Sequence, residues 1–230
     1  MEQIGLLHDG QIYDLQTAEA LNIKGDIIKA DDSKESLEIL RHSCAHMMAQ
    51  AIKELYPEAK FFVGPVVKEG FYYDFKVESK ISDEDLPTIE KKMKEIADRK
   101  LPITRYETTK EEFYEKFKND ELKQAVLKNI KDDTLTIYKQ GDFEDLCRGP
   151  HLPNTRMIRS FKLTRVAGAY LGGDEKNEMI TRIYGIAFFD KQALFDYTKM
   201  IEEAKKRDHR KLGTELELFT FNDDVGAGLP

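Results

Sequence analysis

Two short strings of reactive side chains, about a hundred residues apart, constrain the fold more than any other feature. The first runs from His42 to His46 as His-Ser-Cys-Ala-His, and the second runs from Asp145 to His151 as Asp-Leu-Cys-Arg-Gly-Pro-His. Together they hold three of the five histidines of the chain. This concentration of ligand and acid–base groups predicts a fold that brings both strings to one site.

The first string lies in a segment with the pattern of a helix. Asp32 or Ser33 can cap it, and Pro57 closes it. His42 and His46, four residues apart, share one helix face and can converge on one ligand, although such pairs also occur as partly exposed polar residues. Apolar residues recur at helical spacing: Leu37, Leu40, Cys44, Met47, Met48, Ala51, Ile52 and Leu55.

The second string predicts a rigid bend. Cys147 and His151 flank an Arg-Gly-Pro turn in which proline fixes one dihedral and glycine relieves another, so both side chains can point at one place. With His42 and His46 they would suit a tetrahedral zinc ion. The same groups can also work without metal, because histidine titrates near neutral pH and a carboxylate such as Asp145 can bind an amine. The spacing leaves both alternatives open.

Nine segments, in this order along the chain, resemble the editing region of bacterial threonyl-tRNA synthetases, and the match spans roughly residues 35 to 218. Part of the pattern is shared with the editing domain of alanyl-tRNA synthetases and their free-standing deacylase relatives. The segments are residues 40–46, 62–65, 70–74, 147–151, 161–163, 167–170, 173–174, 182–185 and 207–213.

The resemblance implies an editing hydrolase that cleaves the ester of mischarged seryl-tRNA on the threonine tRNA. One methyl group gives limited discrimination by binding alone, so a second pocket corrects the error. Family motifs map the catalytic residues onto His42, Lys123, His46, Asp145, Cys147 and His151. Tyr73, Asp145 and Arg148 are assigned to substrate binding.

In this hypothesis Asp145 holds the α-ammonium of the seryl group, and the histidines shape the pocket around the ribose and a water. Lys123 and His42 orient that water and stabilise charge developing on the ester oxygen. Cys147 is an alternative nucleophile, ranked below a positioned water. No cofactor is required for editing, zinc at the His/Cys group is an open alternative, and ATP and a further zinc belong to the synthetic domain of such synthetases.

Composition favours a reduced, cytoplasmic protein with a tRNA partner. The two cysteines are far apart in the sequence, which argues against a disulfide. No apolar run is long enough to span a membrane, and residues 1–10 lack the pattern of a signal peptide. The net charge of -7 argues against indiscriminate nucleic-acid binding, so tRNA would need a local basic face. The preferred candidates for that face are Arg156, Arg159, Lys162 and Arg165; residues 205–211 hold a second basic cluster, interpreted as solvated surface charge.

The predicted fold class is α+β, with a largely antiparallel sheet, helices packed on one face, the site at the sheet edge and a small β-rich N-terminal appendage. Asp9-Gly10 is a hairpin signal, Thr109 with Glu112 is a capping box, and Asp190 can cap a last helix with an apolar stripe. Residues 82–100 form a predicted helix. The predicted strands are residues 60–67, 71–77, 103–108, 134–140, 157–166 and 179–189.

The predicted domains are residues 1–32, a remnant of a ubiquitin-like module; residues 33–208, the editing domain; and residues 209–230, a linker and the start of a synthetic domain. Signatures for ATP and threonine activation have no counterpart here, so we expect a fragment that does not charge tRNA, from a synthetase that dimerises through its synthetic domain. Two other readings remain: a free-standing zinc-dependent deacylase, and a non-catalytic tRNA-binding module.

Overall fold

The computed structural model describes residues 1–206. The chain divides into two compact units, Met1–Lys191 and Gln192–Pro230. The described part of the second unit consists of helix α6 (Lys191–Lys206), which follows Asp190 as predicted. Its apolar stripe, including Leu194, Tyr197 and Ile201, is only half-buried.

The N-terminal segment forms a small antiparallel sheet in the order β2-β1-β3. Its strands are β1 (Gln3–His8), β2 (Gln11–Asp14) and β3 (Asp26–Lys29). Asp9 and Gly10 both have positive φ angles, 48° and 75°, which fits the predicted hairpin turn between β1 and β2. Helix α1 (Leu15–Ala20) follows β2, and the side chain of Asp14 caps it by accepting from the Thr17 amide.

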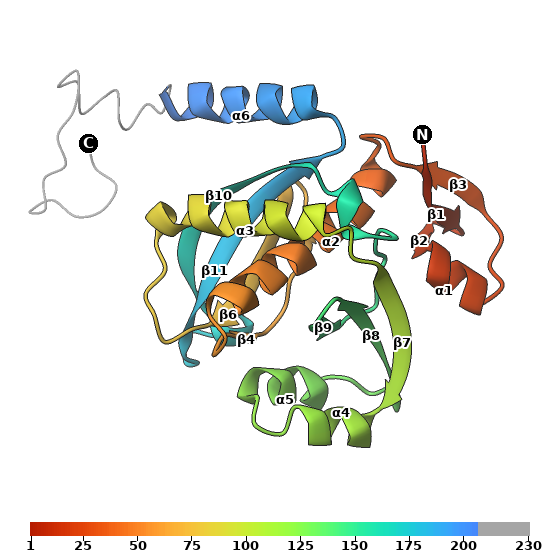
Figure 1. The fold of residues 1–230 in the computed structure, drawn as a ribbon. Helices are drawn as coiled ribbons and strands as arrows, with labels where there is room; N and C mark the ends of the chain where they lie inside the picture. Colours follow the sequence, from red (N-terminus) through yellow and green to blue (C-terminus); the bar gives the residue numbers. More distant parts are fainter. Residues whose placement is uncertain (207–230) are drawn as a thin grey trace, which may run out of the picture. The chain divides into compact units, whose positions relative to one another are not determined.

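The largest sheet has five antiparallel strands, in the order β10-β11-β6-β4 with β5 also paired to β6. Helices α2 (Lys34–Leu55) and α3 (Leu86–Asp98) lie side by side across one face of this sheet (Figure 1). The strands are β4 (Lys60–Phe61), β5 (Val66–Val67), β6 (Gly70–Lys76), β10 (Ser160–Tyr170) and β11 (Met179–Phe188).

Alternation along β6 explains why the helices cover only one face. Phe71, Tyr73 and Phe75 are almost fully buried in the main core, whereas Tyr72 and Asp74 point to the opposite face. Each fully buried apolar side chain contributes roughly 1.5–3 kcal/mol. The predicted stripe of α3 is buried against the same core by Leu86, Ile89, Met93 and Ile96.

A third antiparallel sheet has the order β7-β8-β9 and carries two short helices. The capping box of Thr109 and Glu112 is present at the start of α4, and Phe113 of α4 packs with Leu135 and Ile137 in a second small core. The strands are β7 (Ile103–Thr109), β8 (Thr134–Gln140) and β9 (Phe143–Leu146), and the helices are α4 (Lys110–Lys116) and α5 (Glu121–Lys128).

The predicted α+β class and antiparallel pairing are confirmed, but the strands divide among three sheets. The predicted strand at residues 60–67 is two short strands, because residues 62–65 contain Gly64 and Pro65 and leave the regular ladder. The strand predicted from Met157 begins at Ser160, after a turn of 3-10 helix, and continues to Tyr170. The prediction omitted α1, α5, β3 and β9.

Among the described residues, no helix is both long and apolar enough to cross a membrane. The predicted domain boundary after residue 32 stays a prediction. The predicted boundary after residue 208, the motif at residues 207–213 and the proposed linker at residues 209–230 lie outside the described residues.

Candidate functional site

The two strings meet, as predicted. His42 and His46 project from α2 towards the loop after β9, which carries Cys147 and His151, and one ligand atom from each of these four residues lies within 4.8 Å of the others. The ring of His151 stacks on His42 with a centroid distance of 4.2 Å and lies 4.3 Å from the His46 ring. We refer to these four residues as the His/Cys cluster.

Hydrogen bonds define the tautomers of two histidines. The hydroxyl of Ser43 donates to the Ile39 carbonyl at 2.9 Å, so it accepts from Nδ1 of His151 at 3.1 Å. His42 Nδ1 lies 3.2 Å from the Pro150 carbonyl, which can only accept. Both rings therefore carry the proton on Nδ1 and leave Nε2 as a lone-pair donor within the cluster.

Burial keeps the cluster neutral. It lowers the pKa of His42 to about 4, with the hydrogen bond to Pro150 opposing the shift. It also lowers the pKa of His46 and His151 well below the usual value, and the unfavourable interaction between protonated histidines in the cluster adds to both shifts. Burial and the charge of Asp145 raise the pKa of Cys147, so this residue is a thiol that hydrogen-bonds to His151 Nε2 at 3.1 Å.

A second group of buried polar side chains adjoins the first. Lys123 of α5 and Tyr73 of β6 both donate to the carboxylate of Asp145 on β9, the edge strand of its sheet. Lys123 is 4% exposed, Asp145 2% and Tyr73 1%. Burial lowers the pKa of Lys123 to about 8, with the charge of Asp120 opposing the shift, and raises the pKa of Asp145, with the hydrogen bond from the Leu146 amide opposing it. We refer to these three residues as the inner triad.

The inner triad and the His/Cys cluster share a boundary. The rings of His46 and Tyr73 lie 6.2 Å apart, and the charge of Lys123 contributes to the lowered pKa of His46. No motif in the sequence marks Lys123, yet its side chain lies beside the motif residues. The site combines neutral lone-pair donors with one buried cation and its carboxylate partner.

The loop between β9 and His151 depends on one glycine. Gly149 has a φ of 75°, and a Cβ there would lie 2.5 Å from the Tyr138 hydroxyl and 2.9 Å from an Asp14 oxygen. Asp14 and Tyr138 are buried beside the site, and the sequence offered no signal for either. Ser43 is not among the predicted site residues either, although it stands between the two histidines of the first string.

The remaining predicted site residues lie at the surface. The side chain of Arg148 is 87% exposed and 3.5 Å from Asp132, so it does not join the buried groups. The four basic residues predicted to bind tRNA are all exposed: Arg156 pairs with Glu2, Arg159 pairs with Asp98, and Lys162 and Arg165 lie on β10.

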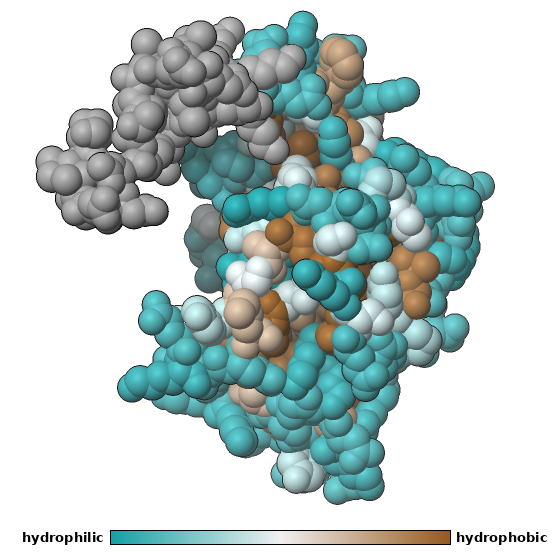
Figure 2. All heavy atoms as spheres, turned by 90° about the vertical axis from the view of Figure 1, so that its left-hand side faces the viewer, coloured by the Kyte–Doolittle hydropathy of each residue, from teal (hydrophilic) through white to brown (hydrophobic). Residues whose placement is uncertain are grey.

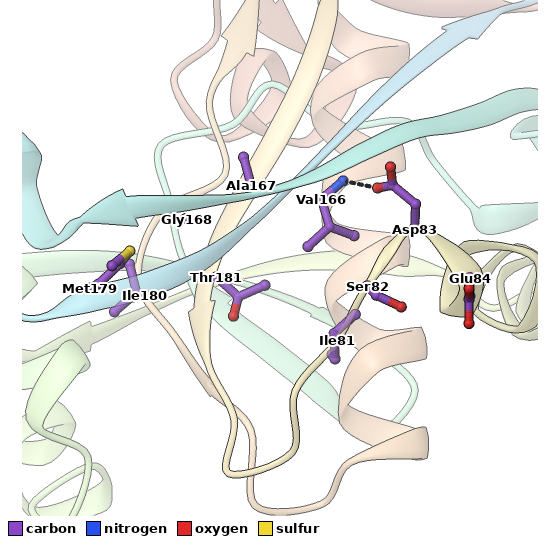
Figure 3. A pocket seen from close by; sticks show the side chains of 10 residues that line it. All are labelled: Ile81, Ser82, Asp83, Glu84, Val166, Ala167, Gly168, Met179, Ile180 and Thr181. Carbon is purple, nitrogen blue, oxygen red and sulfur yellow. Dashed lines mark hydrogen bonds between the residues drawn. The ribbon is translucent and has the colours of Figure 1, made fainter. Parts of the chain in front are cut away.

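A separate groove with a volume of about 710 Å³ lies on β10, β11 and the segment before α3. Figure 3 shows its lining, in which the Asp83 carboxylate accepts a hydrogen bond from the Val166 amide at 2.6 Å. The groove contains no histidine, cysteine or lysine. Figure 2 shows apolar residues gathered near the middle of one largely hydrophilic face. The lining has the hydroxyl and carboxylate groups of Ser82, Asp83, Glu84 and Thr181 but no histidine or cation, so the buried groups are the better candidate.

Comparison with known proteins finds a family match that includes the second string. Residues 135–184 match the family described as the threonyl and alanyl tRNA synthetase second additional domain. This segment contains Asp145, Cys147 and His151, the part of the site contributed by β9 and the loop after it. This segment of the chain is therefore similar to that domain.

Over its whole length the chain matches the N-terminal part of threonine–tRNA ligases. It is 66% identical over 229 residues to the enzyme of Campylobacter jejuni (strain 81116), covering 100% of this chain and 38% of the relative. For the Helicobacter hepaticus ligase the identity is 65% over 229 residues, with the same coverage. The Campylobacter lari ligase is 72% identical over 200 residues, 87% of this chain and 33% of the relative. The chain thus spans little more than a third of the length of these relatives.

Proposed function

We propose that this chain hydrolyses the ester of seryl-tRNA on the threonine tRNA, as the editing part of a threonine–tRNA ligase. The observation that carries the proposal is the meeting of the two strings beside the inner triad. An ester is cleaved by water when a base accepts a proton and a donor stabilises the developing oxyanion. Nε2 of His42 supplies a lone pair, and Lys123 supplies a positive charge in a site of low polarity.

The route through a positioned water is favoured over a covalent one. The raised pKa of Cys147 keeps it as a thiol, and its proton is directed to His151 Nε2. A thiol is a weak nucleophile compared with the thiolate that acyl transfer to cysteine requires. Cys147 therefore shapes the pocket and orients His151 in this proposal.

Asp145 is proposed to bind the α-ammonium of the substrate. Its carboxylate would then have two cationic partners, the ammonium and Lys123. Oδ1 of Asp145 accepts from Lys123 and from the Leu146 amide at 2.7 Å, and Oδ2 accepts from Tyr73. A carboxylate has about four lone-pair positions, so one further donor can be accommodated. The incoming ammonium would loosen the ion pair and direct Lys123 towards the ester oxygen.

The first test compares hydrolysis of seryl-tRNA and threonyl-tRNA, both on the threonine tRNA, with metal content assayed on the same sample. Loss of serine alone without bound zinc supports the proposal. His42→Ala should slow this hydrolysis by about 100-fold or more, as expected for a general base. Lys94→Ala, on the exposed side of α3, is the surface control, and equal rates in both variants would remove the assignment.

A zinc-dependent deacylase is the second candidate, and the His/Cys cluster favours it. Three imidazoles and one thiol are a donor set that zinc accepts, and Nδ1 of His42 and His151 is held by Pro150 and Ser43, as in zinc sites. Catalysis would require that three of these side chains hold the zinc and the fourth leaves a position for a water, whose pKa the metal would lower. Stoichiometric zinc and loss of hydrolysis after chelation would select this candidate, and tRNA binding without turnover would indicate a non-catalytic module.

A further inference from the structure

Asp14, at the end of β2, reaches the site from the N-terminal sheet. Its carboxylate is 1% exposed and accepts three hydrogen bonds. Oδ1 accepts from the Thr17 amide at 2.8 Å, and Oδ2 accepts from the His151 amide at 3.0 Å and from the hydroxyl of Tyr138. One buried carboxylate therefore joins α1, strand β8 and the loop that carries half of the His/Cys cluster.

Asp14 contacts the backbone of His151, and its partner Tyr138 contacts the ring of His151. The Tyr138 ring lies 4.4 Å from the His151 ring, and its hydroxyl lies 3.0 Å from Thr17 Oγ1. Ser43 fixes Nδ1 of His151 from the side of α2. Removing Asp14 leaves the His151 amide and the Tyr138 hydroxyl without this acceptor, so the loop loses the anchor that the N-terminal sheet supplies and keeps those from α2.

We propose that Asp14 is a positioning residue for the His/Cys cluster, through which the N-terminal sheet sets the place of His151 and Cys147. The proposal rests on the proposed function for its effect on rate. Hydrogen bonds to a buried carboxylate are about twice as strong as neutral ones, which suits Asp14 to fixing a loop. A displacement of the order of 1 Å at a site of this kind is expected to reduce the rate by up to about 100-fold.

Docking of the N-terminal segment has a separate anchor, which supplies a matched control. The side chain of Gln16 donates to the Ile103 carbonyl at 2.6 Å and accepts from the Arg105 amide at 2.7 Å, both on β7. Gln16 lies two residues from Asp14 and has no hydrogen bond to the loop among those of the described residues. Gln16→Ala weakens docking of α1 and leaves the His151 contact in place.

The experiment compares Asp14→Ser with Gln16→Ala in the full chain. Serine retains the helix cap, because its hydroxyl can accept from the Thr17 amide, but it is too short to reach the His151 amide. Asp14→Asn keeps the size of the side chain and one acceptor oxygen, so it provides a graded second variant. The measurements are kcat and KM for seryl-tRNA, and amide hydrogen exchange of the segment at residues 147–152.

Positioning predicts that Asp14→Ser lowers kcat by about 10-fold or more with KM changed less than about twofold, and that the His151 amide loses protection. Asp14→Asn should give a smaller loss of kcat, and Gln16→Ala should leave kcat and the protection of that amide unchanged. An unchanged kcat in Asp14→Ser, or an equal loss in Gln16→Ala, overturns the proposal. If the unsubstituted chain does not hydrolyse seryl-tRNA, the proposed function fails; intact protection at His151 in Asp14→Ser would then overturn the positioning role independently.

Discussion

Strand β6 takes part in two polar groups of similar composition, one on each face of the large sheet. On the inner face Tyr73 joins Lys123 and Asp145. On the outer face Asp74 holds Arg182 through two hydrogen bonds of 2.6 and 2.7 Å, and Arg182 lies 3.9 Å above the Tyr72 ring. Each group has a carboxylate, a cation and a tyrosine.

The two groups differ in the cation and in its exposure. The side chain of Lys123 is 4% exposed and that of Arg182 is 23% exposed. Burial lowers the pKa of Lys123 to about 8, whereas the hydrogen bonds to Asp74 raise the pKa of Arg182. The inner cation can thus exchange a proton near neutral pH, and the outer one stays charged. The comparison indicates that the inner face suits chemistry and the outer face suits structure or recognition.

The largest expected effect is a difference in the free energy of unfolding when each of the two ion pairs is broken. Lys123→Met leaves the carboxylate of Asp145 buried without its cation, which should cost about 3–5 kcal/mol of unfolding free energy. Asp74 is as buried as Asp145, but Arg182→Met should cost less, because the place of the guanidinium is partly open to solvent and water can enter it to hydrate the carboxylate. Urea unfolding of both variants measures the difference. The double variant Lys123→Met/Asp145→Leu should recover much of the loss; equal costs for the two single variants would contradict the comparison.

The second prediction is that acid destabilises the folded chain through the histidines on the inner face. His42 is neutral in the folded chain, with a pKa of about 4, and has a pKa near 6.5 when unfolded. Below about pH 6.5 the unfolded chain binds more protons, so stability falls as pH falls towards 4. This group alone should contribute about 2 kcal/mol, discounted for its partial exposure. Urea unfolding between pH 7 and 4 measures the effect.

The control is His42→Gln, whose stability should depend less steeply on pH over the same window. His46 and His151 shift in the same direction, so a residual slope is expected in that variant. Identical pH profiles in the two proteins would show that His42 is not buried as a neutral base.

The third prediction concerns Gly64, a residue outside the inner triad that contacts the ring of Tyr73. A Cβ at Gly64 would lie 2.4 Å from two ring carbons of Tyr73. Gly64→Ala should therefore displace the ring that donates to Asp145 and cost about 1–3 kcal/mol, as overpacking does. Thermal unfolding and the seryl-tRNA rate measure the two consequences. Gly172→Ala measures the opposite case, a φ of 68° with no atom within 4 Å of the Cβ, whereas Gly64 has no positive φ and its cost should come from the contact with Tyr73.

Much of this site was predictable because its residues stand in strings with their own local geometry. Helical spacing placed His42 and His46 on one face, and the turn residues placed Cys147 opposite His151. The contact between the two strings depends on which sheet each element joins, and spacing carries no information about that. Asp14 shows the limit most clearly. It reads as an ordinary helix cap after a hairpin, and only the packing of α1 against β7 and β8 brings it to the His151 amide.

The smallest effect is expected on the outer face. The Arg165 guanidinium lies 4.1 Å above the Tyr184 ring, and the exposed stack should be worth about 0.5–1 kcal/mol. If Arg165 also contacts tRNA phosphate, Arg165→Ala should reduce the salt dependence of binding by roughly 0.7–0.9 in the slope of log K against log salt. Lys94→Ala, on the exposed side of α3, is the control. Equal slopes in all three proteins would confine Arg165 to a structural role, and the outer face would then serve the fold alone.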